Sequence, residues 1–572
     1  MIIEAIRAAS AKVTAPGQPY EVVPQTIDGV AFRVFRNAPA NLRELYRSSL
    51  VHADKDFYVY QNERYTFDAS WRQAARVAHR LIAAGVKQGD RVGIAARNYP
   101  EWLFAFMGIT SIGAVAVTMN AWWSSEELAY GIDDSGLEWL FADAERLERV
   151  LPLCATRKLH LIAIRADHIA AANTDVQAWQ EFVDGASEEM PEPTVAPDAN
   201  ATILYTSGST AHPKGVLATH RSIIHAVMGW ECGAAIAVEL NPALAEESPE
   251  FPPAMILTVP LFHVSGLNVQ FMSSFRPGRK LVGMYKWDPE ESLRLIEAER
   301  VTSFNGVPTM SWEMVQSPNF HKYDTRSLKS MGGGGAAMAP EHSRQIAKEL
   351  KSGVPGTGYG MTETNGLGTS ISGADLLERG RSCGRPIPPM VTIKVVDPNG
   401  REVPRGETGE IWIHGAQNFR GYWNKPDATR ETLKEGWVCS GDIGHMDSED
   451  FVFITDRAKD MVIRGGENIG CQEVEAAIYA HPCVSECAVF GVPDERLGES
   501  IAAVVMVKPN MRLTPDDVRA HVALHLARFK VPEHVWVRAE QLPRIASGKI
   551  YKRGLRDEAV AQLQAAVRKV SA

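Results

Sequence analysis

The sequence predicts an α/β protein with more than one domain. Segments typical of strands and of helices alternate along the first half of the 572 residues, which favours parallel sheets covered by helices. The length exceeds the roughly 100–200 residues of a single domain. In the second half, 411–414 and 451–455 have the pattern of antiparallel strands with polar turns. After residue 456 a compact strand-and-helix pattern returns.

The elements of the first half follow one another in order. Apolar residues at helical spacing predict a helix over 70–85, and a short buried strand is expected at 91–95. A buried helix over 101–112 then leads into a strand over 114–119. Further buried strands are expected at 139–142, 159–164 and 201–204. Two stretches are expected to be surface loops, the proline-rich 190–197 and the acidic 241–253.

The uncharged stretch 102–125 is long enough to raise the question of a membrane span. Polar and small residues such as Gly108 and Asn120 interrupt it, so a buried helix followed by a buried strand explains it better. Residues 1–10 mix Glu4 and Arg7 with apolar residues and do not have the pattern of a signal peptide. No transmembrane segment is expected.

Composition excludes several classes of function. There are 60 Lys and Arg against 69 Asp and Glu, a net charge of −9, so no basic field favours binding to nucleic acid. The seven cysteines form no C-x-x-C pair, so neither a zinc site nor a redox motif is predicted. Reduced thiols in a cytoplasmic protein are expected.

A candidate phosphate-binding loop follows the strand at 201–204. Residues 205–215 read Y-T-S-G-S-T-A-H-P-K-G, with two glycines, four aliphatic hydroxyl side chains and Lys214. Backbone amides and hydroxyls donate to phosphate oxygens, and lysine adds a positive charge. Because Lys214 is followed by Gly215, the segment is not a Walker loop. On composition alone, an ordinary surface loop stays an alternative.

This segment resembles the signature loop of the adenylate-forming superfamily, which includes acyl-CoA synthetases, with Ala211 where a glycine is usual. The resemblance implies that ATP phosphates are held by Thr206, Ser207, Gly208, Ser209, Thr210 and Lys214. The run G-Y-G-M-T-E at 358–363 resembles the family motif Y-G-x-T-E. It implies that Tyr359 and Gly360 contact adenine, that Thr362 contacts the α-phosphate, and that Glu363 with Thr206 binds Mg²⁺.

Three further runs resemble motifs that lie in the second half of the family's sequences. G-W-V-C-S-G-D at 436–442 implies that Asp442 holds the ribose hydroxyls. D-R-A-K-D at 456–460 resembles the hinge motif, with Arg457 as a second ribose contact and Lys459 as the pivot. L-P-R-I-A-S-G-K at 542–549 resembles the motif of the catalytic lysine, here Lys549.

Residues 465–469 resemble the loop that, in the family, borders the tunnel through which the thiol substrate enters. The resemblance assigns Gly465, Gly466 and Glu467 to the coenzyme A tunnel. Lys530 is a candidate to bind a phosphate of coenzyme A, and the alternative is an ordinary solvated lysine. Cys471 stands where the family usually has proline, and we expect this change to loosen the loop.

The acyl pocket is implied by P-L-F-H-V-S-G at 260–266 and by the glycines at 332–335. The resemblance places His263, Val264, Gly332, Gly335, Asn365 and Gly366 at the acyl group, and Gly333 and Gly334 along the adenine. The glycine run predicts a deep or wide pocket. Family members that activate amino acids carry an aspartate in this segment, which pairs with the substrate ammonium. Residues 260–266 hold none, so the resemblance disfavours an amino acid substrate. A fatty or otherwise bulky apolar acid is favoured, an aryl acid stays open, and Asn365 hints at one polar substituent.

The resemblance also implies the architecture. A large domain over 1–456 is expected to contain two parallel-type sheets with helices and a distorted β-barrel. A small, mobile α+β domain over 457–572 is expected to rotate about the hinge near Lys459.

The implied reaction has two steps. A carboxylate attacks ATP to give acyl-AMP and pyrophosphate, and the thiol of coenzyme A then displaces AMP, with catalytic roles for Lys549, Glu363, Thr362 and His263. ATP, Mg²⁺ and coenzyme A are thus implied, and a homodimer is left open. The alternatives are a ligase that loads a separate carrier protein, a luciferase-like oxygenase and an inactive ATP-binding module.

Overall fold

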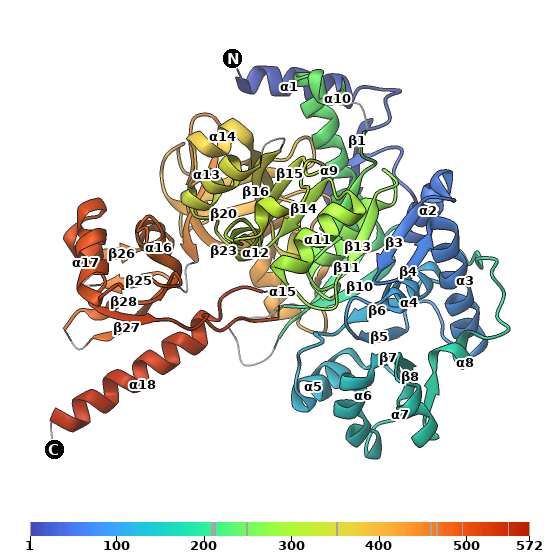
Figure 1. The fold of residues 1–572 in the computed structure, drawn as a ribbon. Coiled ribbons are helices and arrows are strands. Elements are labelled where there is room, and N and C mark those ends of the chain that lie inside the picture. The colour runs from blue at the N-terminus through green and yellow to red at the C-terminus, as the bar shows by residue number, and fades with distance from the viewer. Residues whose placement is uncertain are drawn as a thin grey trace.

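A large body and a smaller C-terminal unit beside it make up the chain (Figure 1). The computed structural model describes residues 2–206, 213–246, 250–350, 353–457, 460–464, 467–494, 496–546 and 548–570. The mixed α/β class and the division into a large and a small part are as predicted.

The first sheet of the large body has eight strands. In spatial order these are β21 (Gly421–Tyr422), β11 (Gly215–Thr219), β10 (Asn200–Tyr205), β6 (Val115–Thr118), β5 (Arg91–Ala95), β7 (Trp139–Asp143), β8 (His160–Ile164) and β9 (Val176–Ala178). The strands from β10 to β9 are parallel, while β11 and β21 join antiparallel at one edge. The five buried strands predicted in the first half are β5, β6, β7, β8 and β10.

The second sheet has nine strands. In spatial order these are β18 (Arg385–Pro386), β17 (Thr369–Ser372), β16 (Val354–Tyr359), β15 (Ser330–Gly334), β14 (Ser303–Gly306), β12 (Ala254–Leu257), β13 (Lys280–Gly283), β3 (Asp56–Tyr60) and β4 (Glu63–Thr66). Its six central strands, β16 to β3, are parallel. The carboxyl ends of these strands therefore meet at one edge.

Helices cover both sheets. Those of the large body are α1 (Ile2–Val13), α2 (Leu42–Ser48), α3 (Phe67–Ala83), α4 (Pro100–Ser111), α5 (Ser125–Ser135), α6 (Ala144–Val150), α7 (Asp167–Ala172), α8 (Trp179–Val183), α9 (His220–Leu240), α10 (Ala243–Glu246), α11 (Pro289–Glu299), α12 (Pro308–Val315), α13 (Pro340–Glu349), α14 (Gly373–Glu378) and α15 (Pro426–Thr432). The predicted helix 70–85 is α3, which Thr66 caps by accepting a hydrogen bond from the Ala69 N–H. The predicted helix 101–112 is α4, which is buried on nearly all sides.

An antiparallel sheet of five strands forms the third unit of the large body. Its strands are β19 (Thr392–Val396), β20 (Gly409–His414), β22 (Leu433–Lys434), β23 (Trp437–Met446) and β24 (Val452–Arg457). The predicted strands 411–414 and 451–455 are β20 and β24. A hairpin of β1 (Val22–Ile27) and β2 (Val30–Phe35) packs nearby, where Phe32 stacks on His414.

The C-terminal unit is built on a separate five-stranded sheet. Its elements are β25 (Val462–Arg464), β26 (Glu467–Ile469), α16 (Cys471–Tyr479), β27 (Val484–Asp494), β28 (Gly498–Val507), α17 (Pro515–His525), β29 (His534–Arg538) and α18 (Lys552–Val570). Figure 1 shows α18 extending away from the large body, although Leu555 and Ala559 pack against this sheet. β24 belongs to the large body up to Arg457, so the predicted boundary at 456/457 falls inside that strand. The exact boundary between the two domains stays a prediction.

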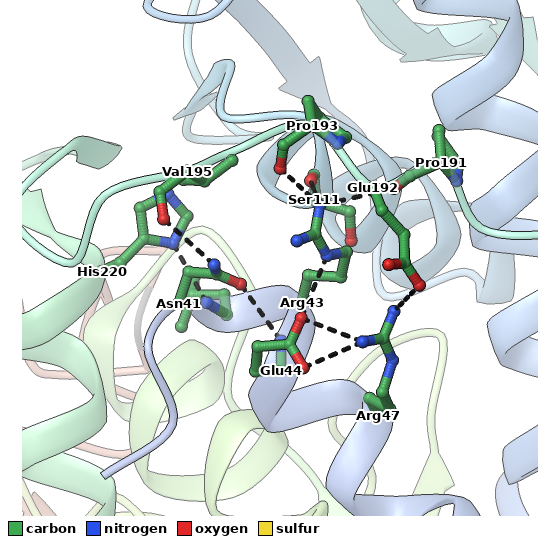
Figure 2. Close-up of polar contacts among 11 residues, drawn as sticks. Asn41, Arg43, Glu44, Arg47, Ser111, Pro191, Glu192, Pro193, Val195 and His220 are labelled. Carbon is green, nitrogen blue, oxygen red and sulfur yellow. Dashed lines mark hydrogen bonds and ion pairs between the residues drawn. The ribbon is translucent and has the colours of Figure 1, made fainter.

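The proline-rich stretch 190–197 is a loop, as predicted, and α2 holds it in place (Figure 2). The Arg43 guanidinium donates to the carbonyl oxygens of Pro193 at 2.9 Å and of Pro191 and Ser111 at 3.4 Å. The Asn41 side-chain amide donates to the Val195 carbonyl. The predicted loop 241–253 is different, because it contains the short helix α10.

One helix of the described chain, α9, is long and apolar enough to cross a membrane. Half of its most apolar window is buried within the fold, and the core helix of a globular protein has the same composition. The uncharged stretch 102–125 is not such a helix. As predicted, it divides into α4 and β6.

Candidate functional site

The candidate site lies at the carboxyl edge of the nine-stranded sheet. β15 ends at Gly334, and the next residue, Gly335, has a φ of +77°. β16 ends at Tyr359 and runs into the short helix η6 (Thr362–Thr364). The loop after β12 carries His263. Parallel α/β sheets commonly bind ligands at this edge, because loops from several strands converge there.

Lys549 reaches this edge from the C-terminal unit. A Cβ atom added to Gly335 would lie 3.2 Å from the Lys549 Cε and 3.4 Å from its Nζ. The preceding residue, Gly548, has a φ of +86° and lies against Val307 and Met310 of the large body. Two segments that are more than 200 residues apart therefore meet at the ammonium group of Lys549.

His263 faces the same lysine. The Ser265 N–H donates to its Nδ1 at 3.2 Å, which leaves the ring proton of the neutral form on Nε2. Burial and, to a smaller extent, the charge of Lys549 lower the pKa of His263 to about 3. The imidazole is therefore neutral at physiological pH.

The glycines of β15 allow close contact between neighbouring strands. A Cβ on Gly332 would lie 1.9 Å from the carbonyl oxygen of Gly356, and one on Gly333 would lie 2.3 Å from that of Gly306. Neighbouring backbone thus occupies the place of the absent side chains, so close contact between strands by itself requires glycine at these two positions. Gly334 and Gly335 lie nearer the edge. A Cβ on Gly334 would lie 3.2 Å from the carbonyl oxygen of Gly358, and one on Gly335 would lie 3.2 Å from the Lys549 Cε.

Tyr359, which is half-buried, and Asp442, which is buried, form a polar pair between two sheets. The Tyr359 hydroxyl donates to the Asp442 carboxylate, and Asp442 is only 5% exposed. Burial, reinforced by the charge of Asp442, raises the pKa of Tyr359 well above its usual range. Asp442 lies opposite Arg457 in the pairing of β23 with β24, so the two predicted ribose contacts are neighbours in the backbone.

Glu363 belongs to a second polar group at the site. It is 7% exposed, and its Oε1 accepts a hydrogen bond from the Tyr422 hydroxyl at 2.6 Å. The Lys214 ammonium lies 4.8 Å from the centre of the Tyr422 ring. Thr206 and Lys214 flank the predicted phosphate loop and are joined by a backbone hydrogen bond of 3.0 Å. Ser207, Gly208, Ser209 and Thr210 lie outside the described residues.

The surroundings of Gly366 outline the predicted acyl pocket. A Cβ there would lie 3.2–3.5 Å from side-chain atoms of Val269, Trp230 and Val264. Val264 and Val269 come from the N-terminus of the π-helix η3 (Ser265–Phe271) and from η3 itself, a helix form that is frequent at functional sites.

Asn365 is 2% exposed, and its amide is engaged with the protein. It donates to the Gln417 carbonyl at 2.8 Å and to the Ser222 hydroxyl at 3.2 Å, and it accepts from Asn268 at 3.0 Å. These partners account for a polar residue here without a polar substituent on the substrate.

The residues assigned to coenzyme A are not brought to Lys549 by any described contact. Gly465, Gly466 and the pivot Lys459 lie outside the described residues. Glu467 is exposed on β26. Lys530 forms an ion pair of 2.6 Å with Glu473 of α16.

The loosening expected from Cys471 stays a prediction, because Gly465 and Gly466 of that loop lie outside the described residues. Cys471 itself makes a backbone hydrogen bond. It is the first residue of α16, and its N–H donates at 2.6 Å to the carboxylate of Asp456 at the end of β24. Proline could not make this bond, because it lacks an N–H. The departure from the family pattern therefore adds a hydrogen bond between the start of α16 and the end of β24.

Sequence reasoning missed Tyr422, Trp230 and Val269. Aromatic and aliphatic residues carry no chemical signature in a sequence, and these three reach the site only through the folding of β21, α9 and η3. In the sequence, the feature that comes closest to marking one of these positions is Gly421, the neighbour of Tyr422.

Comparison with known proteins identifies the family of this chain. The family model described as AMP-binding enzyme matches residues 45–423, and that of the AMP-binding enzyme C-terminal domain matches residues 473–549. A feruloyl-CoA synthase of an Amycolatopsis species is 35% identical over 482 residues, which cover 84% of this chain and 91% of the relative. A long-chain-fatty-acid–CoA ligase of Bacillus subtilis is 30% identical over 537 residues, which cover 88% and 92%.

A solved structure has the same fold. The fatty acyl CoA synthetase of Mycobacterium tuberculosis superposes with a TM-score of 0.69 at 30% identity, over 91% of this chain and 99% of that chain.

Proposed function

Because the chain belongs to the acyl-CoA synthetase family of AMP-binding enzymes, we propose a substrate class and residue roles for an AMP-forming ligase of a carboxylic acid and coenzyme A. The family activity proceeds through an acyl-AMP. The substrate that we propose is an apolar carboxylic acid, fatty or otherwise bulky.

One observation carries the residue roles: Lys549, His263 and Gly335 meet at the carboxyl edge of the nine-stranded sheet. In this proposal the Lys549 ammonium lies beside the substrate carboxylate and the α-phosphate. It stabilises the negative charge that builds up as the carboxylate attacks phosphorus. The arrangement is thus the one that serves acyl-AMP formation. Neutral His263 borders the acyl group without adding a charge.

The roles that we propose in nucleotide binding are based on the Tyr359–Asp442 pair and the Glu363–Tyr422 pair. Tyr359 and Gly360 border the adenine together with Gly333 and Gly334, and Asp442 and Arg457 bind the ribose. An ionised carboxylate only accepts hydrogen bonds, so Asp442 suits two hydroxyl donors. Thr362 contacts the α-phosphate, and Lys214 with the loop over 206–210 holds the outer phosphates.

The Mg²⁺ that the family implies fits the ligands present. Glu363 offers a buried carboxylate and Thr206 a hydroxyl, and oxygen ligands of this kind are those that Mg²⁺ prefers. When bound, the ion would offset the charge of the phosphates. Tyr422 orients the Glu363 carboxylate for this role.

The acyl pocket supports an apolar substrate. Val264, Val269 and Trp230 surround Gly366, and none of them offers a charge to a substrate. An aryl acid is the second candidate, because the Trp230 indole beside Gly366 gives an aromatic ring a flat surface to pack on.

The direct test is release of pyrophosphate from ATP with and without coenzyme A, across fatty acids of increasing length, benzoates and cinnamates. We expect acid-dependent pyrophosphate with at least one apolar acid, and formation of its thioester when coenzyme A is added. Pyrophosphate without a thioester would instead favour a ligase that loads a carrier protein. No acid-dependent pyrophosphate with any acid would favour the ATP-binding module.

We also propose a cytoplasmic location. The seven cysteines are all free, which supports reduced thiols in that compartment. The homodimer stays a prediction, which light scattering on the purified protein measures.

A further inference from the structure

The loop that carries Lys549 is a tight turn within the C-terminal unit. The Ile545 N–H donates to the Lys549 carbonyl at 2.8 Å, and the Gly548 N–H donates to the Ile545 carbonyl at 2.8 Å. Arg544 and Ile550 pair across the base of the turn as an isolated β-bridge. The turn fixes the shape of the loop but does not by itself aim Lys549 at the large body.

Helix α12 of the large body supplies a surface for this turn. The Thr309 hydroxyl donates to the Gly548 carbonyl at 3.4 Å, and Met310 lies against Gly548. One helical turn later, Glu313 accepts hydrogen bonds from Arg544 at 2.7 Å and from the Gln541 amide at 2.9 Å. One face of α12 thus contacts the turn at Gly548 and the residues just before it, Gln541 and Arg544.

Arg544 connects this face to the lysine. Its guanidinium donates to the Gly548 carbonyl at 3.0 Å, the peptide group that joins Gly548 to Lys549. The same side chain pairs with Glu313 of the large body and with Glu486 of its own unit. Arginine is suited to this task because its planar group presents several donors in fixed directions.

We propose that Glu313 and Arg544 form a latch between the two units that positions Lys549 for acyl-AMP formation. Both are positioning residues, since neither reaches the reacting atoms. The proposal rests on the adenylation role of Lys549 given above. It adds to that role the two residues that hold Lys549 in position.

The latch can act on one half-reaction alone. Glu486 lies in the same unit as Arg544, so this pair moves as one body, whereas Glu313 belongs to the other unit. Loss of the Glu313 carboxylate therefore removes the ion pair with Arg544 across the interface and leaves Arg544 paired with Glu486. Thioester formation from acyl-AMP, for which the family reorients the small domain, does not need the contact.

The test is Glu313→Gln in the full-length enzyme. Glutamine keeps the size of the side chain, and its single amide oxygen can accept from Trp287 in the place of Oε2. Its NH2 group then replaces Oε1, which accepts from Arg544 and Gln541, so we expect the fold to be retained while the latch is broken. Acid-dependent exchange of labelled pyrophosphate into ATP reports adenylation. Formation of thioester from synthetic acyl-AMP and coenzyme A reports the second half-reaction.

We expect kcat for adenylation to fall about 10- to 100-fold, since misplacement of a catalytic group by about 1 Å costs up to about 100-fold. KM for ATP and for the acid, and the rate of thioester formation, should stay within about twofold. Glu313→Asp, which restores the charge, should recover part of the rate. The matched control is Glu341→Gln on α13, where the carboxylate pairs with Arg344 within the large body.

Equal losses in both half-reactions would mean a structural role and would overturn the latch. An unchanged adenylation rate in Glu313→Gln would overturn it as well, while the proposed function would stand. A wild-type enzyme without any acid-dependent exchange would overturn the proposed function and the latch together.

Discussion

Gly335 leaves room for Lys549 in a way that only glycine can. Its φ of +77° is a conformation that other residues rarely adopt, and the place of its absent Cβ lies 3.2 Å from the lysine side chain. The glycine run was visible in the sequence, but its meaning was not. Gly332 and Gly333 serve close contact between strands, and only Gly335 opens toward the reacting group.

We predict that Gly335→Ala reduces adenylation at least 10-fold, because the methyl group displaces the Lys549 ammonium and the backbone is strained. Pyrophosphate exchange measures the effect. Gly406→Ala is the matched control, since Gly406 has a φ of +90° with no atom within 4 Å of the Cβ position. A similar loss in both variants would show that backbone strain alone is responsible.

At the scale of elements, buried strands and helices were readily predicted. β5, β7 and β8 are short apolar runs between polar turns, and α3 has a clear apolar face. The short α10 was missed, because its sequence lies in an acidic stretch with prolines on both sides. The outcome at Cys471 could not be predicted, since it depends on the position of Asp456 at the end of a different element.

We predict that the Cys471 thiol is unreactive in the folded protein. It is buried at the start of α16, and burial raises its pKa well above the usual range, so little thiolate forms. Brief treatment with iodoacetamide at pH 8, followed by peptide mass spectrometry, should leave Cys471 unmodified. Cys483, a partly exposed thiol in the same unit, is the internal control. Equal labelling of the two would contradict the placement of Cys471.

At the scale of the whole molecule, the sequence predicted the two-part architecture through its resemblance to a family, but not the surface along which the two parts meet. That surface joins α12 and α13 to α16 and to the loop of Lys549. In it, His342 stacks on Trp312 with ring centres 4.3 Å apart and packs edge-on against Tyr479. Such pairings depend on the relative placement of distant segments and carry no local signal.

We predict that acid weakens the folded protein through its buried histidines. Burial lowers the pKa values of His220 and His342 to about 3 and that of His225 to about 4. An unfolded histidine titrates near pH 6.5, so below that pH the unfolded chain binds protons that the folded chain does not. Each histidine then lowers the free energy of unfolding by about 1.4 kcal/mol per pH unit, down to its folded pKa.

Urea titrations at pH 7.5 and 5.5 measure this loss. His342→Phe keeps the stack on Trp312, and among the described residues neither ring nitrogen of His342 has a hydrogen-bond partner. The variant should therefore lose less stability between the two pH values than the wild type. An unchanged pH dependence would contradict the assignment.

The central claim is that the structure holds Lys549 where acyl-AMP forms, and Lys549→Ala tests it most directly. Removal of one charge-stabilising group should depress adenylation by roughly 10²–10³-fold. Thioester formation from synthetic acyl-AMP and coenzyme A should continue at close to the wild-type rate. Equal losses in the two half-reactions, or no loss in adenylation, would contradict the account.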